Sequence, residues 1–217
     1  ALCMLSSVIN INLLKSAKKN NIKKFFYSSS ACVYPSYRQK DYKHPKLKEK
    51  DVYPADPEDG YGWEKLFNER MCRHFYEDFG LETRVARYHN VYGEFGSWND
   101  GREKAPAALS RKFAESIHTK KNEIEIWGNG NQVRSFLYID DCIKGTDLLF
   151  KSNFREPINI GNDKSVTINQ LASILEKITG HKVHKRYDTS KPKGVDSRSS
   201  DNTLVKKVLN WEPKVST

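Results

Sequence analysis

The stretch DGYGWEKLFNERMCRHFYEDFG, residues 59–80, decides how this chain folds. Its apolar residues recur at mixed steps of three and four, which predicts an amphipathic helix that ends just before Gly80. These apolar residues are Trp63, Leu66, Phe67, Met71, Phe75 and Phe79. Tyr61 and Lys65 lie four residues apart and would share one face of the helix. Because an ammonium group favours a neighbouring phenolate and lowers the phenol pKa, the pair is a candidate proton shuttle for alcohol oxidation.

The Tyr-x-x-x-Lys pattern occurs three times, beginning at Tyr42, Tyr61 and Tyr187. Pro45 interrupts the first copy and Pro192 follows the third, and each disfavours a helix at its own site. Only the middle copy therefore lies on a predicted helix. The spacing alone also fits a core-facing tyrosine beside a solvated lysine, so the rest of the chain must decide between the two.

Composition narrows the class of protein. The chain has 217 residues, 37% apolar and 29% charged, which suits one large or two small globular domains. Predicted strands and helices alternate along it, which is typical of the α/β class. Its four cysteines are scattered without a Cys-x-x-Cys pair, and His181 and His184 are isolated. We therefore expect no metal site and no disulfide framework, and a reducing, cytoplasmic compartment.

The net charge of +10 raises the question of a nucleic-acid partner. The lysines are spread along the chain and accompany no nucleic-acid motif, so we expect none. A solvated basic surface that suits an anionic substrate explains the charge better. No apolar run is long enough to span a membrane, so no membrane partner is expected either.

Outward from the central helix, the pattern predicts an ordered series of elements. Gly80 and residues 128–130 mark turns, and residues 128–130 are predicted to form a hairpin between two strands. Asp140 is predicted to cap the helix that begins there. A capping box of Thr167 and Gln170 begins another helix. The predicted helices cover residues 5–19, 106–113, 140–150, 167–179 and 201–209. The predicted strands cover residues 24–28, 81–92, 123–127, 133–139, 157–161 and 183–187. Residues 39–59 are predicted to form a surface loop.

Small hydroxyl residues follow the first predicted strand, at residues 28–30. An open α/β sheet places its ligand crevice at such strand ends, although a serine-rich turn is an equally good interpretation of this segment alone. A dinucleotide fold also needs a glycine-rich phosphate turn, and the 217 residues contain none. We therefore expect these residues alone to bind NAD weakly.

Three segments together carry a family resemblance: residues 25–34 (FFYSSSACVY), residues 61–65 (YGWEK) and residues 134–141 (RSFLYIDD). They resemble the extended short-chain dehydrogenase/reductase family of nucleotide-sugar epimerases and dehydratases. Cys32, residues 101–106 (GREKAP) and residues 127–134 (WGNGNQVR) resemble its GDP-mannose 3,5-epimerase branch in particular.

The resemblance implies a partial doubly wound, Rossmann-like parallel sheet that lacks its first βαβ region, with a smaller α/β substrate domain. Residues 1–96 would be the C-terminal half of the NAD-binding domain. Residues 97–217 would form mainly the nucleotide-sugar domain, with a return strand near residues 157–161. Family members carry their glycine-rich turn in an earlier segment, so the chain is expected to be truncated at both ends and inactive alone.

The resemblance also implies roles for single residues in the epimerisation of GDP-mannose at C3 and C5 through a transient C4 ketone. Tyr61 would take the C4 hydroxyl proton, Lys65 would lower the Tyr61 pKa and hold NAD with Ser28 and Tyr61, and Ser30 would bind the C4 oxygen. Cys32 and Lys104 would be the acid–base pair at C3 and C5. By residue type alone, Cys32 could equally be a buried small residue and Lys104 a solvated charge.

Further positions match the family's substrate contacts. The expected substrate-binding residues are Ser30, Cys32, Asn90, Glu103, Lys104, Ala105, Lys112, Gln132, Arg134 and Arg198. Arg134 and Arg198 are the candidates for the diphosphate, because a guanidinium group suits phosphate oxygens. Residues 196–197 (Asp-Ser) and a longer segment at residues 118–122 depart from the family pattern.

Two alternatives stay open: a nucleotide-sugar 4-epimerase or 4,6-dehydratase, or a catalytically dead remnant that serves as a binding or dimerisation module. A dehydratase would be expected to carry an acidic pair after the strand-end serine, where Ala31 and Cys32 stand. The resemblance further implies a homodimer formed through the helices at residues 5–19 and 61–79.

Overall fold

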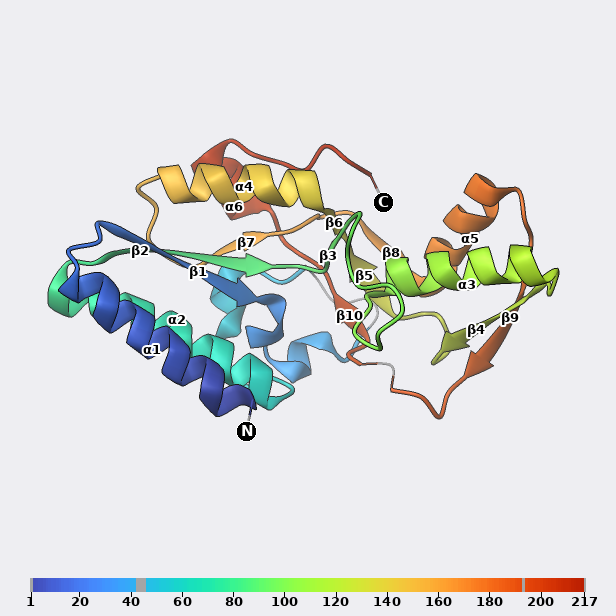
Figure 1. Ribbon diagram of the computed structural model, residues 1–217, viewed down its shortest axis with the longest axis horizontal. Helices are drawn as coiled ribbons and strands as arrows, with labels where there is room; N and C mark the ends of the chain where they lie inside the picture. The colour runs from blue at the N-terminus through green and yellow to red at the C-terminus, as the bar shows by residue number, and fades with distance from the viewer. Residues whose placement is uncertain (1, 42–45, 193, 217) are drawn as a thin grey trace.

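The computed structural model describes residues 2–41, 46–192 and 194–216 (Figure 1). One three-stranded sheet has the order β1-β2-β7, with β1 at Lys24–Ser30, β2 at Glu82–Tyr88 and β7 at Ile158–Ile160. Both pairings are parallel, and the β1–β2 register runs from Lys24 opposite Glu82 to Ser30 opposite Tyr88. The expected Rossmann-like α/β fold is confirmed. The first Tyr-x-x-x-Lys copy, at Tyr42, lies outside the described residues.

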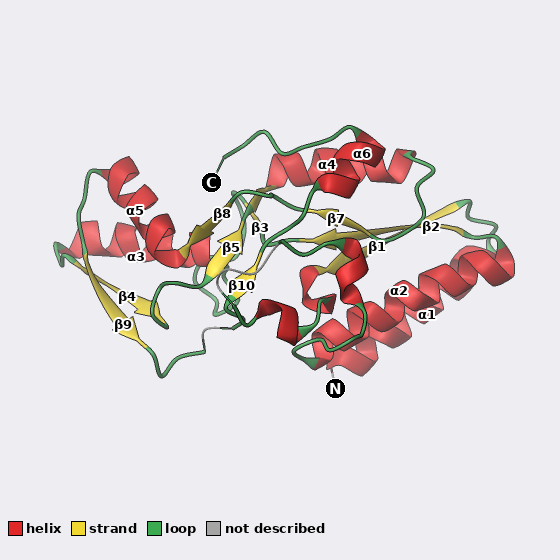
Figure 2. Cartoon of the chain, turned by 180° about the vertical axis from the view of Figure 1, so that it is seen from behind, coloured by secondary structure: helices red, strands yellow, loops and turns green. Residues whose placement is uncertain are grey.

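Helices cover both faces of this sheet. Helices α1 (Leu2–Lys19) and α2 (Gly60–Phe79) lie along one face, and α4 (Ile139–Lys151) and α6 (Thr203–Leu209) lie on the other (Figures 1 and 2). The strands therefore carry buried apolar side chains on both sides. Leu14, Tyr27, Cys72, Phe75 and Val85 are among the residues of one cluster, and Ala86, Leu149, Ile158, Ile160 and Trp211 are among those of the other.

The central helix α2 has the predicted ends but not the predicted buried face. The Asp59 side chain accepts a hydrogen bond from the Gly62 N–H, and Gly80 ends the helix with a left-handed φ of 69°. Trp63, Phe67 and Phe79 are about half exposed. The residues of α2 that are buried are Gly62, Glu64, Leu66, Asn68, Glu69, Cys72 and Phe75. Three of these seven buried residues, Glu64, Asn68 and Glu69, are polar, and several apolar side chains of α2 are left on the outer face.

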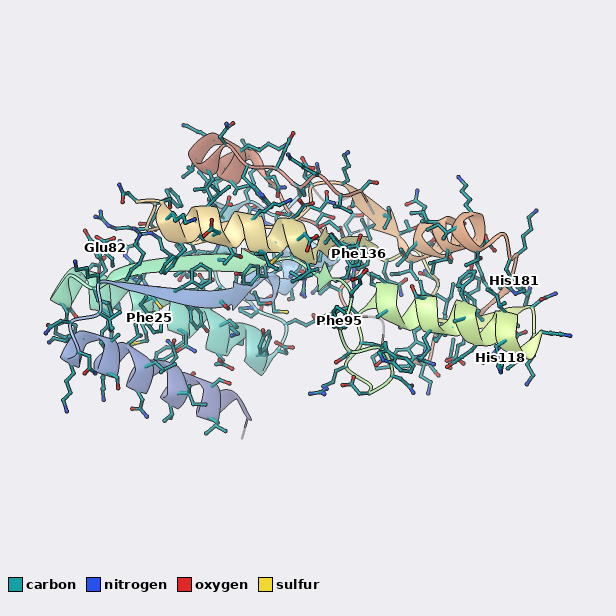
Figure 3. All side chains as sticks on the ribbon, turned by 45° about the horizontal axis from the view of Figure 1, so that its top comes forward. Phe25, Glu82, Phe95, His118, Phe136 and His181 are labelled. Atoms are coloured by element: carbon teal, nitrogen blue, oxygen red, sulfur yellow. The ribbon has the colours of Figure 1, made fainter. Side chains whose placement is uncertain are left out.

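A second group of elements lies beyond the carboxyl ends of these strands. It contains α3 (Ala105–Thr119), α5 (Ile168–Thr179), and the parallel pair β4 (Glu123–Trp127) and β9 (His184–Asp188). Between the groups lie the sheet β10-β5-β8, at Ser197–Arg198, Val133–Ser135 and Ser165–Thr167, and the pair β3 (Val91–Tyr92) and β6 (Leu137–Tyr138). Figure 3 shows Phe25 and Glu82 at one end of the molecule, His118 and His181 at the other, and Phe95 and Phe136 between them.

Several predictions of local structure are wrong. The single strands expected at residues 81–92 and 133–139 are each divided between two sheets, as β2 and β3 and as β5 and β6. The Gly128–Gly130 turn is no hairpin, because β4 pairs with the distant β9 and not with β5. Asp140 does not cap α4, whose N-cap is Tyr138 without a side-chain hydrogen bond. Residues 39–59 are not wholly a surface loop. Their described part includes the short 3₁₀ turn η3 (Glu49–Val52), and Gln39, Leu47 and Val52 are buried.

Candidate active site

Tyr61 and Lys65 lie side by side on the first turns of α2, next to the end of β1. The Lys65 Nζ donates to the Ser28 carbonyl oxygen at 3.1 Å and lies 5.5 Å from the centroid of the Tyr61 ring. The Tyr61 side chain is 44% exposed, so it can reach a ligand at the strand end. Burial of its inner part raises the Tyr61 pKa, while a hydrogen bond with Ser30 lowers it. The lowered pKa predicted from Lys65 is therefore not found, because Lys65 faces the ring and Ser28, and burial dominates.

Ser30 and Cys32 continue from β1 into the 3₁₀ turn η1 (Ala31–Val33). The Ser30 Oγ accepts a hydrogen bond from the Cys32 backbone N–H at 3.2 Å, which fixes both residues at the sheet edge. The Arg198 Nη1 donates to the Cys32 Sγ at 3.2 Å. This contact places the positive charge of the guanidinium group next to the Cys32 sulfur. The close approach of α2 to η1 depends on Gly62, where a Cβ would overlap the Cys32 carbonyl oxygen.

A cavity of about 390 Å³ adjoins this corner and extends toward α3 and β4. It contains eight of the predicted substrate-binding residues. These are Asn90, Glu103, Lys104, Ala105, Lys112, Gln132, Arg134 and Arg198. Ser30, Cys32 and Tyr61 are not among its lining residues, and Arg198 connects the two groups by contacting Cys32 while it lines the cavity. The fold therefore brings residues from distant parts of the chain to one place.

Two arginines stand in register in this cavity. Arg198 of β10 pairs directly with Arg134 of β5. Burial and the charge of Arg198 lower the Arg134 pKa to about 10, so both side chains still carry a positive charge near neutral pH. Arg134 donates to the Val133 carbonyl oxygen at 2.8 Å and to that of Val195 at 2.5 Å. Two like charges on adjacent strands repel each other, and an anion between them relieves that repulsion.

Other lining groups offer both donors and acceptors to a ligand. The Lys112 Nζ donates to the Glu125 carbonyl oxygen at 2.7 Å, and burial lowers the Lys112 pKa. The Gln132 Nε2 donates to the Trp127 carbonyl oxygen at 3.1 Å. Within the described part of the chain, the buried Gln132 Oε1 and Glu103 Oε2 accept no hydrogen bond. The Glu103 pKa is lowered by backbone hydrogen bonds, so its carboxylate is ionised and can accept from a ligand.

Sequence reasoning missed the residues that orient Arg198. The Gln39 Oε1 accepts from the Arg198 Nε at 2.6 Å, and Glu58 lies 3.7 Å from its Nη2. Gln39 is fully buried, and its Nε2 donates to the carbonyl oxygens of Tyr34 and Pro35. Both Gln39 and Glu58 fall in the segment that was expected to be a surface loop. A glutamine in a charged, proline-containing stretch gives no pattern by which its burial could have been found.

A larger cavity lies elsewhere, bordered by α2, β2, the η3 turn and residues 153–157. Its volume is about 790 Å³, and Tyr53, Tyr76 and Arg155 are among its lining residues. None of the predicted catalytic or substrate residues lines it. Across the described ranges of the chain, no group of three or more His, Cys, Asp or Glu residues could hold a metal ion. Nor does any helix in those ranges have the length and apolar character needed to cross a membrane.

The fold and this corner define a class of protein. The chain belongs to the NAD dependent epimerase/dehydratase family, whose model matches residues 4–161.

More particular similarities follow. The chain is 45% identical to GDP-mannose 3,5-epimerase of Arabidopsis thaliana over 97% of its own length and 54% of that protein's. It is 47% identical to GDP-mannose 3,5-epimerase 1 of Oryza sativa subsp. japonica over 96% of its own length and 53% of that protein's. The crystal structure of UDP-glucose 4-epimerase from Thermotoga maritima has a TM-score of 0.84 at 29% identity, covering 95% of this chain and 63% of that one. The chain thus spans about half the length of the curated relatives that it matches.

Proposed function

We propose that the protein epimerises GDP-mannose at C3 and C5, using NAD, through a transient ketone at C4. The observation that carries this proposal is the meeting of Cys32 with Arg198, next to the Ser30–Tyr61–Lys65 corner and at the edge of the cavity that Lys104 lines. A 4-epimerase needs only Ser30, Tyr61 and Lys65 for its oxidation and reduction at C4. A thiol beside a guanidinium group adds a second acid–base centre, which inversion at C3 and C5 requires.

The corner suits oxidation and reduction at C4. Ser30 donates a hydrogen bond to the C4 oxygen, and Tyr61 takes the proton from the C4 hydroxyl and later returns it. Lys65, held by the Ser28 carbonyl oxygen, presents its ammonium group beside the Tyr61 ring. That ammonium group and Ser28 would hold the ribose of bound NAD, which supplies the oxidant and then the reductant for C4. The open strand end, the exposed Tyr61 side chain and the partly buried Lys65 side chain beside it fit such a group.

Inversion at C3 and C5 takes a base on one face of the sugar and an acid on the other. The C4 ketone acidifies the protons on both neighbouring carbons. Cys32 and Lys104 supply the two groups, and Arg198 holds a positive charge beside the Cys32 sulfur. The Arg134–Arg198 pair binds the diphosphate, which brings the sugar toward Ser30 and Cys32.

Replacing Cys32 separates the two halves of the reaction. In the full-length protein, Cys32→Ala should still reduce its NAD when given GDP-mannose, seen as nicotinamide absorbance. Solvent deuterium incorporation at C3 and C5 should fall by a factor on the order of 10². Lys104→Ala should behave similarly. Unchanged deuterium uptake in Cys32→Ala would refute the 3,5-epimerase proposal.

A nucleotide-sugar 4-epimerase is the second candidate, because the similar structure from Thermotoga maritima is titled a UDP-glucose 4-epimerase. Such an enzyme would show little exchange at C3 and C5 in the wild type. Both Cys32→Ala and Lys104→Ala would then keep near-normal activity. The same deuterium experiment therefore distinguishes the two candidates.

We also infer a homodimer formed through α1 and α2. The two helices pack together, with the Asn10 Nδ2 donating to the Asn68 Oδ1 at 3.0 Å. Their outer faces carry apolar side chains that are about half exposed. These are Leu5, Val8, Ile9 and Leu13 of α1 and Trp63 and Phe67 of α2. An apolar face of this kind suits burial against a second copy of the chain.

A further inference from the structure

One buried hydrogen-bond network lies behind the candidate active site and takes part in none of the steps above. Its centre is the ion pair between Glu69 of α2 and Arg87 of β2, whose side chains are 3% and 4% exposed. The pair is bidentate: the Arg87 Nε donates to the Glu69 Oε1 at 3.0 Å, and its Nη2 donates to Oε2 at 2.7 Å. The Ser29 Oγ also donates to Oε1, at 2.5 Å. The carboxylate is thus fixed by two strands at once.

One branch of the network reaches the Tyr61–Lys65 corner. Tyr61, Lys65 and Glu69 follow one another at four-residue steps, so they share one face of α2. Lys65 is held by Ser28, Glu69 is held by Ser29, and Tyr61 interacts with Ser30. Three turns of α2 therefore meet three consecutive residues of β1. Because a helix moves as a unit, displacing Glu69 also displaces Tyr61.

The other branch reaches the segment that carries Cys32. The Arg87 Nη1 donates to the Tyr34 Oη at 3.4 Å, and that hydroxyl donates to the Asn159 Oδ1 of β7 at 2.7 Å. Tyr34 is the residue that ends the η1 turn, two positions after Cys32. The Asn159 Nδ2 donates in turn to the Leu47 carbonyl oxygen at 2.9 Å. Tyr34 therefore ties the η1 turn to β2 and β7.

We propose that the Glu69–Arg87–Tyr34 network is a positioning device with two separable branches, one for Tyr61 and one for Cys32. The inference rests on the function proposed above. A buried ion pair is weak evidence for stabilisation, because desolvation of both charges offsets their attraction. Its geometry is strong evidence for orientation, because the bidentate pair and the serine hydroxyl together allow one placement of α2 on the sheet.

Two conservative variants test the branches separately. Glu69→Gln should lower C4 oxidation about tenfold through displacement of Tyr61, while the ratio of C3/C5 deuterium exchange to C4 oxidation stays unchanged. Tyr34→Phe should leave C4 oxidation within about twofold and lower that ratio about tenfold. If the network only stabilises the fold, both variants will lower both steps in proportion, and the inference is overturned.

A measurement that needs neither NAD nor substrate tests the positioning network independently of the proposed function. In the ligand-free protein, Tyr34→Phe should change the rate of Cys32 alkylation by iodoacetamide about threefold or more, whereas Glu69→Gln should not. An equal effect of both variants on alkylation would contradict the two-branch scheme. A wild type that shows no exchange at C3 and C5 would instead refute the proposed function, and the alkylation comparison would still test the network.

The Glu69→Gln variant needs a control for destabilisation, because the substitution leaves the buried Arg87 charge without the Glu69 carboxylate. The double variant Glu69→Gln/Arg87→Met removes that charge and should recover the melting temperature. It should not recover C4 oxidation, because the helix has lost its fixed placement. Recovery of both together would show that the pair acts through stability alone.

Discussion

At the scale of single residues, two tyrosines with the same Tyr-x-x-x-Lys pattern lie in different surroundings. Tyr61 stands on α2 beside Ser30 and Lys65, whereas Tyr187 stands on β9 and donates to the Asn169 Oδ1 at 2.9 Å. In the full-length protein, Tyr61→Phe should lower kcat about 10²-fold or more with little change in KM, because proton transfer matters in the transition state. The kcat of Tyr187→Phe should stay within about twofold of the wild-type value. Equal steady-state kinetics for the two variants would contradict the assignment of Tyr61.

His89 should make stability depend on pH. It is fully buried, and burial lowers its pKa to about 4. The unfolded chain takes up this proton below about pH 6.5, so stability is complete above that pH and falls as the pH drops from about 6.5 to about 4. The loss at this one site should reach about 3 kcal/mol. Urea unfolding of the wild type and of His89→Gln at pH 7 and pH 4.5 measures it.

The control for His89 is His118, which is exposed on α3. His118→Gln should keep the pH dependence of the wild type, while His89→Gln should flatten it. Identical slopes for the wild type and His89→Gln would mean that other groups cause the acid sensitivity.

At the scale of elements, sequence reasoning succeeded where the determinants are local. The helix α5 begins at the capping box of Thr167 and Gln170 and ends at Gly180, as predicted, because each signal acts within one turn. The prediction for the Gly128–Gly130 turn was wrong because each residue of β4 pairs with a β9 residue 61 positions further along the chain. Periodicity could not show that Glu69 is buried, because its burial is made favourable by Ser29 and Arg87, which lie on distant strands.

The residues predicted to bind substrate show the same division. Arg134 and Arg198 were chosen by residue type and resemblance, and the fold places them in register on β5 and β10. Their closeness could not be derived from the sequence, because sixty-three residues separate them in the chain. The contact of Arg198 with Cys32 was also not foreseen, because it depends on Gln39 and Glu58 in a segment without a clear pattern.

The contact between α2 and η1 leads us to expect that a glycine-to-alanine substitution in this helix is destabilising. Replacing glycine by alanine inside a helix normally stabilises it by about 1 kcal/mol. At Gly62 a Cβ would overlap the Cys32 carbonyl oxygen and lie 2.8 Å from the Pro57 Cβ. Gly62→Ala should therefore destabilise the protein by about 1–3 kcal/mol, because α2 must move away from η1. Chemical unfolding measures this change.

The control for Gly62 is an exposed helical position. Ser110→Ala on α3 should leave stability within about 0.5 kcal/mol of the wild type. A stabilised Gly62→Ala variant would show that η1 moves away from α2 at little cost. The position of Cys32 would then be less firmly fixed than the structure indicates.

At the scale of the whole molecule, the proposed dimer depends on the outer faces of α1 and α2. Phe67→Lys and Leu13→Lys should each shift the protein from dimer to monomer in sedimentation velocity, because a lysine at a paired apolar surface is left without a partner. Ile178→Lys is the matched control. It replaces a more exposed apolar side chain on α5, in the other half of the molecule, and should leave the oligomeric state unchanged. A monomeric wild type would refute the dimer.

The paired arginines of β5 and β10 also bear on how the chain holds its own fold together. The two strands meet over only two residue pairs, and one of those pairs sets Arg134 against Arg198. An anion bound there acts as a removable electrostatic bridge that fastens a late segment of the chain onto an earlier one. Pyrophosphate at 100 times its Kd would add about 2.7 kcal/mol to the stability of any unit that it bridges. Proteolytic cleavage near residues 194–198 should therefore slow as pyrophosphate is added, and a diphosphate ligand would help to build the site that binds it.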